Sequence, residues 1–197
     1  MNDNHLQMLA SPRWAEVLRT HVLPWLESVG ELGDDVLEIG PGPGLTTDLL
    51  LTMTTRITAV EVDAGLAAQL ARRLAGSNVE VINTSAERTG LAADRFSAAA
   101  CFAVLHHTET AAVQDRVFAE LLRVLRPGGI LVGSEGYDNE RTRQAHAGDQ
   151  FVPVDPDGLP RRLSAIGFTE IAVEHGEFDF RFHARKRLLD NCCTVIS

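Results

Sequence analysis

A glycine-rich loop is the first feature of the sequence that could do chemistry. Residues 38–44 read Glu-Ile-Gly-Pro-Gly-Pro-Gly and lie between an apolar run, typical of a buried strand, and a segment with helical spacing. Glycine at alternating positions lets the chain turn sharply and lets a ligand approach the backbone without obstruction by a Cβ atom. The following helix would offer free N–H groups and a positive dipole end. The loop therefore predicts a site for a nucleotide-like ligand with an anionic end.

An acidic residue, Glu61, is the second such feature, 21 positions after Gly40 at the end of the next predicted strand. A carboxylate there can accept hydrogen bonds from both ribose hydroxyls of an adenosine. Asp63 is a weaker candidate for this role. Both features also suit NAD, but the dinucleotide pattern G-x-G-x-x-G needs a glycine where this chain has Leu45. The loop thus favours a ligand without a pyrophosphate.

Two adjacent histidines, His106 and His107, follow the fourth predicted strand. Loops at the carboxyl edge of an open α/β sheet gather over its ligand crevice, and a histidine there can act as a general base near neutral pH. Glu135, Tyr137 and His146, after the fifth predicted strand, are further candidates. The sequence does not single out one base.

The spacing of apolar residues predicts the elements that must position these groups. Strands are predicted at residues 36–39, 56–63, 79–83, 96–104 and 130–136, and helices at 45–53, 64–75, 114–125 and 159–166. Such alternation is typical of parallel βαβ units. Two last strands, 169–173 and 178–184, lie too close together for a helical crossover and should pair antiparallel. The expected fold is α/β, a doubly wound, Rossmann-like, mostly parallel seven-stranded sheet with one antiparallel strand and helices on both faces.

The residue patterns suggest how the chain is divided into an N-terminal layer, a ligand-binding domain and a tail. Residues 13–29 have helical spacing, and Pro24 should kink or split that segment. We interpret residues 1–33 as an N-terminal helical layer or lid and 34–187 as one ligand-binding domain. No role is assigned to 188–197. Residues 136–158 are polar and too long for a plain connection, and such loops often carry function.

The composition restricts the kinds of molecule that the protein is expected to bind. Eighteen basic residues against 27 acidic ones give a net charge of −9, which repels nucleic acid and favours a small-molecule substrate. Without an apolar run near ~20 residues or a secretory pattern at its start, the chain is expected to have no membrane span and to be cytoplasmic. The three cysteines, Cys101, Cys192 and Cys193, form no metal-ligand spacing, so no metal is expected. The oligomeric state stays open.

Five motifs, in this order and spacing, together resemble one family. They are VLEIGPGPG (36–44), ITAVEVD (57–63), SAERTGL (85–91), FAVLHH (102–107) and LLRVLRPGGILV (121–132). In these motifs the chain is similar to the class I S-adenosylmethionine-dependent methyltransferases, in particular their ubiquinone/menaquinone biosynthesis-like small-molecule branch. The resemblance is close over residues 34–135 and looser elsewhere.

The resemblance implies a role for each matched position. Glu38, Gly40, Pro41, Gly42 and Gly44 would hold the methionine part of S-adenosylmethionine, Glu61 the ribose, Val62 the adenine face, and Ser85, Ala86 and Glu87 the adenine edge. The stretch that begins with Cys101 and Phe102 and ends at Leu105 would lie near the sulfonium. The site of the methyl acceptor would be lined by Leu105, His106, Glu135 and Tyr137. Relatives commonly carry aspartate where this chain has Ser85 and Ser97, and a hydroxyl is the weaker acceptor for an amino group.

The implied activity is methyl transfer to a small-molecule acceptor through an oxygen, nitrogen or carbon nucleophile, with S-adenosylhomocysteine as the second product. The cofactor supplies the reactivity, so the protein must mainly align the reactants and exclude water. Two other readings remain open: an NAD(P)-binding oxidoreductase-like domain, and a non-catalytic module that only binds a nucleoside.

Overall fold

The computed structural model describes residues 3–188 and contains one seven-stranded sheet with the order β3-β2-β1-β4-β5-β7-β6. Its strands are β1 (Asp35–Ile39), β2 (Arg56–Glu61), β3 (Val79–Asn83), β4 (Phe96–Phe102), β5 (Leu125–Gly136), β6 (Phe168–His175) and β7 (Asp179–Lys186). Its α-helices are α1 (Asp3–Leu9), α2 (Pro12–Val17), α3 (Leu23–Val29), α4 (Leu45–Leu50), α5 (Ala64–Arg73), α6 (Ala111–Val124), α7 (Glu140–Ala145) and α8 (Leu159–Ile166).

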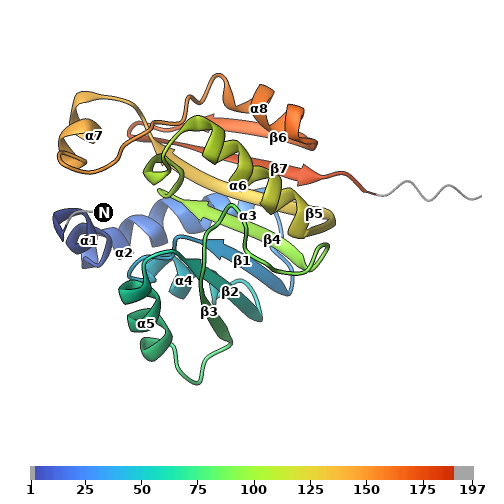
Figure 1. The fold of residues 1–197 in the computed structure, drawn as a ribbon, viewed down its shortest axis with the longest axis horizontal. Helices are drawn as coiled ribbons and strands as arrows, with labels where there is room; N and C mark the ends of the chain where they lie inside the picture. The colour runs from blue at the N-terminus through green and yellow to red at the C-terminus, as the bar shows by residue number, and fades with distance from the viewer. Residues whose placement is uncertain (1–2, 189–197) are drawn as a thin grey trace, which may run out of the picture.

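Helices cover both faces of the sheet, as Figure 1 shows for α6 in front and α3 behind it. Neighbouring residues of β1 point to opposite faces: Leu37 packs in the core that holds α6 and α8, and Val36 in the core that holds α3, α4 and α5. Every residue of β1 is buried. A parallel strand covered on both faces reads as a continuous apolar run, which is why the sequence predicts it clearly.

One strand runs against the others. β7 pairs antiparallel with both β5 and β6, for example Val132 of β5 opposite His183 of β7, while the other strand pairs are parallel. The short connection between β6 and β7 leaves no room for a crossover. The predicted mostly parallel seven-stranded Rossmann-like sheet with one antiparallel strand is therefore confirmed.

Pro24 interrupts the N-terminal helical segment as expected. A π-helical turn, Leu18–Val22, separates α2 from α3, and Pro24 lies in the first turn of α3. Proline has no N–H to donate to the preceding turn, so the helix widens there. Trp25 is buried, and its indole N–H donates to Glu174 of β6 at 3.0 Å, which ties this layer to the edge strand of the sheet.

Some boundaries differ from the prediction because local contacts decide them. α6 begins at Ala111 rather than residue 114, since the Thr110 hydroxyl accepts the N–H of Val113 at 3.2 Å. The segment 136–158 is not a plain loop, because it contains α7.

No helix among residues 3–188 has the length and apolar character needed to cross a membrane. Positions 189–197, with Cys192 and Cys193, lie outside the described residues.

Candidate active site

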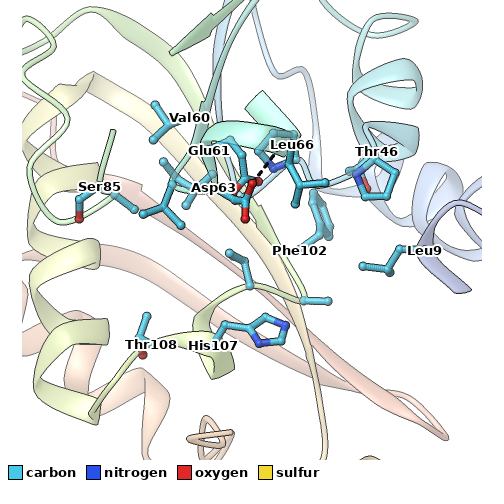
Figure 2. A pocket seen from close by; sticks show the side chains of 18 of the residues that line it. Leu9, Thr46, Val60, Glu61, Asp63, Leu66, Ser85, Phe102, His107 and Thr108 are labelled. Carbon is cyan, nitrogen blue, oxygen red and sulfur yellow. Dashed lines mark hydrogen bonds between the residues drawn. The ribbon is translucent and has the colours of Figure 1, made fainter. Parts of the chain in front are cut away.

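A cavity of about 900 Å³ opens at the carboxyl ends of β1, β2 and β4. Figure 2 shows Glu61 and Asp63 on the opposite side of it from His107 and Thr108. Glu61 is the last residue of β2 and Asp63 follows it, whereas His107 and Thr108 follow β4. Ligands of open α/β sheets bind where the strand order reverses, and here the order reverses between β1 and β4. The cavity therefore lies where the fold predicts a ligand.

The glycine loop forms one wall of this cavity with a backbone that other residues would strain. Gly40, Gly42 and Gly44 have φ angles of 64°, 52° and 88°. The Gly40 N–H donates to the Val60 carbonyl at 2.9 Å, and a Cβ atom at position 40 would lie 2.2 Å from Cγ2 of Val104. A Cβ atom at position 44 would likewise lie 2.3 Å from Cδ1 of Leu70, so the predicted demand for glycine is steric at Gly40 and Gly44 and conformational at all three positions.

Glu61 lies in the cavity wall and organises its neighbours. Its carboxylate accepts the N–H of Gly42 at 3.2 Å and the N–H of Asp63 at 2.9 Å. The side chain of Asp63 in turn caps α5 by accepting the N–H of Leu66 at 2.9 Å. Glu61 is only 6% exposed, so its charge acts with little screening by bulk water. A carboxylate has about four acceptor sites, so two remain for a ligand.

Glu38 lies behind the glycine loop rather than on the cavity surface. It is buried, and the hydroxyl of Thr47 donates to it at 2.6 Å. Burial raises the pKa of Glu38 to about 7, because the charged carboxylate loses its hydration there. Without a cationic partner, this group therefore keeps its proton close to neutral pH.

The raised pKa predicts how stability depends on pH. The unfolded carboxyl ionises near its ordinary pKa of 4.5 and the folded one near 7, so the free energy of unfolding should fall as pH rises between these values. Glu38→Gln removes this loss. We expect the cofactor-free variant to exceed the wild type by up to ~3 kcal/mol at pH 8 and to match it at pH 4. Urea unfolding at both pH values measures the difference, and parallel pH profiles for the two proteins would contradict it.

The residues expected at the adenine all line the cavity. Val62 is 72% exposed and free to pack on a ligand face, and Ser85, Ala86 and Glu87 follow β3 along the same wall. The Glu87 carboxylate accepts from Arg116 at 2.6 Å, which directs it toward α6. The positions of Ser85, Ala86 and Glu87 are compatible with the predicted role at an adenine edge, which stays a prediction.

The two adjacent histidines have different environments. A 3₁₀ turn, Leu105–His107, carries both, and Ala103 leads into it with a left-handed φ of 51°. This conformation is rare for a residue with a Cβ atom, and His107 of the turn that follows lines the cavity. His106 is buried behind that wall, where its Nδ1 contacts the Glu135 carboxylate.

Glu135 anchors this turn from β5. One of its oxygens accepts the N–H groups of Val104 and Leu105, at 3.0 and 2.7 Å, and the other contacts His106. On the far side, Nε2 of His106 lies 3.0 Å from Nε2 of His146, a residue just after α7. Burial lowers the pKa of His146, which favours its neutral form.

Several predicted site residues do not line the cavity. Cys101 is fully buried in the core, and its burial raises the pKa of the thiol well above the ordinary value. Leu105 and Glu135 are buried behind the wall with His106. The hydroxyl of Tyr137 donates to the carbonyl of Gly176 at 3.2 Å, at the turn between β6 and β7. Gly42, Gly44 and Glu38 support the wall from behind, while Gly40, Pro41, Glu61, Val62, Ser85, Ala86, Glu87, Phe102 and His107 line it.

Other lining residues were not found from the sequence. Leu6, Leu9 and Trp14 reach the cavity from the N-terminal helices, and Asp149 and Gln150 from the segment after α7. The apolar side chains of α1 at helical spacing were an available signal. Nothing in the sequence places residues 149–150 there, because their position depends on the Val152 N–H donating to the His106 carbonyl at 2.8 Å.

Comparisons with known proteins agree with this geometry. The family described as "Methyltransferase domain" matches residues 37–133. Ribosomal RNA small subunit methyltransferase A of Koribacter versatilis (strain Ellin345) is 46% identical over 59 residues, which is 29% of this chain and 21% of that protein. The chain thus spans about a fifth of that curated relative.

Two solved structures share the fold. A SAM dependent methyltransferase from Aquifex aeolicus is 18% identical with a TM-score of 0.73, covering 94% of this chain and 98% of that one. N-methyltransferase NodS from Bradyrhizobium japonicum WM9, in complex with S-adenosyl-L-homocysteine, is 21% identical with a TM-score of 0.72, covering 94% and 93%. The family match includes the glycine loop, Glu61 and the histidine turn, and the two solved structures share the fold, so this chain resembles the class I S-adenosylmethionine-dependent methyltransferases.

Proposed function

We propose that this chain transfers the methyl group of S-adenosylmethionine to a small, largely apolar acceptor bound in the same cavity. The observation that carries the proposal is the extent of that cavity, which runs from Glu61 to His107. Ligand pockets usually measure ~300–1,000 Å³, so about 900 Å³ gives room for a cofactor and a second small molecule.

In this proposal the β1 and β2 ends hold the cofactor. The loop at Gly40 and Gly42 would follow the methionine backbone, and Glu61 would accept from the ribose hydroxyls. Glu38 would act from behind the loop, where its charge would attract the cationic amino group without lining the cavity. A buried carboxyl with a pKa of about 7 ionises readily once a cation lies beside it, so binding of the amino group would stabilise the charged form of Glu38.

The acceptor would lie on the other side, between the N-terminal helices and α6. Leu9 and Trp14 from the helices and Val113 and Val117 from α6 give this part of the wall an apolar surface. His107 supplies a polar group near it. Of the two adjacent histidines, His107 alone lines the cavity, so it is the one that can contact an acceptor directly.

An apolar wall and a net charge of −9 favour a small acceptor over RNA. The curated relatives that methylate ribosomal RNA are similar over only 50 to 70 residues, 17–25% of their length. We therefore take that similarity as support for S-adenosylmethionine as the methyl donor, and not as support for RNA as the acceptor.

The chemistry is a direct displacement. The sulfonium of the cofactor supplies an activated methyl group, which a nucleophilic atom of the acceptor takes as the carbon–sulfur bond breaks. The residues of this chain would hold the two reactants in line and keep water out. Phe102 and Val104, where β4 ends, lie between the two halves of the wall and would border the reacting atoms.

Two measurements test the proposal. Calorimetric titration should show binding of S-adenosylhomocysteine and much weaker binding of NAD, and the reverse order would favour the oxidoreductase-like reading. Transfer of a labelled methyl group should then be assayed on phenols, amines and quinone precursors, with small-subunit ribosomal RNA as a further acceptor. Turnover on RNA alone would overturn the small-acceptor proposal, and turnover on none would favour a nucleoside-binding module.

A further inference from the structure

Three histidines converge beside the acceptor end of the cavity. His106 and His107 come from the turn after β4, and His146 follows α7, forty residues along the chain. One ring nitrogen of each lies within 4.8 Å of those of the other two. The sequence gives no sign of this cluster, because only the tertiary structure brings His146 beside the two adjacent histidines.

The hydrogen bonds fix which ring nitrogens face one another. His146 Nδ1 lies 2.8 Å from the carbonyl oxygen of Thr142, and a carbonyl can only accept, so Nδ1 carries the hydrogen. His106 Nδ1 faces one oxygen of the Glu135 carboxylate, whose other oxygen accepts two backbone N–H groups, so Nδ1 is the nitrogen placed to donate. In neutral rings, both Nε2 atoms then present lone pairs to each other.

Two lone pairs 3.0 Å apart repel unless a positive charge lies between them. Two nitrogen ligands about 2.0–2.1 Å from one zinc ion lie about 2.9–3.4 Å apart at angles from square to tetrahedral. Metal-ligating histidines also usually donate their other ring N–H to a carboxylate or a backbone carbonyl, as His106 and His146 do here. Both observations suit a cation bound between these two rings.

We propose that His106, His107 and His146 form a binding site for one divalent transition-metal ion of the zinc type. Imidazole nitrogens suit zinc, cobalt and nickel, whereas magnesium and calcium prefer oxygen ligands. Three protein ligands leave a fourth position open, as in catalytic zinc sites. His107 lines the cavity, so a metal ion could enter from that side and its open position would face the acceptor.

The role of this ion rests on the proposed function, although its binding does not. A hydroxyl oxygen of the acceptor at the open position would lose its proton more readily, since a metal ion stabilises the negative oxygen. His107 would then act through the metal rather than as a base. The preferred acceptor would accordingly carry a phenolic or alcoholic hydroxyl.

Metal binding can be measured without any methyl transfer. The chelator-treated protein should bind one equivalent of Zn²⁺ in a calorimetric titration. Bound Co²⁺ should give visible d–d absorption bands with the intensity typical of a low coordination number. We expect His146→Ala to weaken Zn²⁺ binding at least ~100-fold and Glu135→Gln ~10-fold, on the usual effect of second-shell partners. His21→Ala, which removes an exposed histidine of the N-terminal layer, should leave binding unchanged.

Binding of S-adenosylhomocysteine to His146→Ala shows whether that variant is folded. Wild-type protein that binds no Zn²⁺ would overturn the proposal and leave a shared proton between the rings as the explanation. Equal Zn²⁺ affinity of His146→Ala and wild type would also overturn it. Neither result affects the acceptor assay, and a zinc-bound protein that methylates nothing would contradict only the proposed function.

Discussion

Replacing Gly40 with alanine is expected to remove most of the cofactor affinity and to lower the free energy of unfolding by at least ~2 kcal/mol. The added Cβ would lie 2.2 Å from Cγ2 of Val104, whose β-branched side chain has few alternative rotamers. The φ of 64° adds strain that glycine does not have. Urea unfolding and calorimetric titration with S-adenosylhomocysteine measure the two effects.

Gly42→Ala provides the matched control. Its φ of 52° carries the same kind of strain, but a Cβ there would have no heavy atom within 4 Å. We expect a loss of only ~1–2 kcal/mol from conformation alone. Equal losses for the two variants would show that the contact with Val104 is unimportant, and that the glycine at position 40 serves only the backbone angle.

Glu61→Ala should raise the dissociation constant of S-adenosylhomocysteine at least ~10-fold, since charged hydrogen bonds contribute ~1.5–3 kcal/mol. Two losses would combine: the proposed hydrogen bonds to the ribose, and the hydrogen bonds that hold the N–H groups of Gly42 and Asp63 in place. Glu61→Gln keeps one acceptor oxygen and should lie between alanine and wild type. Calorimetry at one ionic strength gives all three constants.

The control for the loss of charge is Glu80→Ala. Glu80 belongs to the neighbouring strand β3 and is exposed outside the cavity, so its removal changes the net charge equally. We expect less than a twofold change in affinity there, because exposed charges are screened by salt. A similar loss of affinity for both variants would mean that the net charge of the protein, and not the hydrogen bonds of Glu61, determines the affinity.

Much of the fold follows from local patterns. β1 and β4 are buried on both faces, so their apolar runs stand out, and the short link before β7 requires an antiparallel partner. At Arg126–Gly129 the same reasoning failed in part. Strand β5 is predicted to begin at residue 130, but it begins at Leu125, which pairs with Phe96 before a bulge.

The cofactor side was more predictable than the acceptor side. Glu61 and Gly40 act through contacts to nearby strand ends, and the order of strands in the sequence is enough to place them. The positions of His146 and Asp149 depend on how residues 136–158 fold back, through the Val152 N–H and the Gln114 amide, which donates to the Val152 carbonyl at 2.9 Å. Such long-range docking leaves no periodic signal in the sequence.

The cavity wall is built from two kinds of chain segment. Its donor side comes from residues 37–133, the part shared with the family, while Leu6, Leu9, Trp14, Asp149 and Gln150 lie before or after it. In the proposed function, substitutions in these flanking stretches would change the shape of the acceptor site without altering the contacts of Glu61 and the glycine loop with the methyl donor. A change of acceptor would then need no change in the part of the chain that binds the methyl donor.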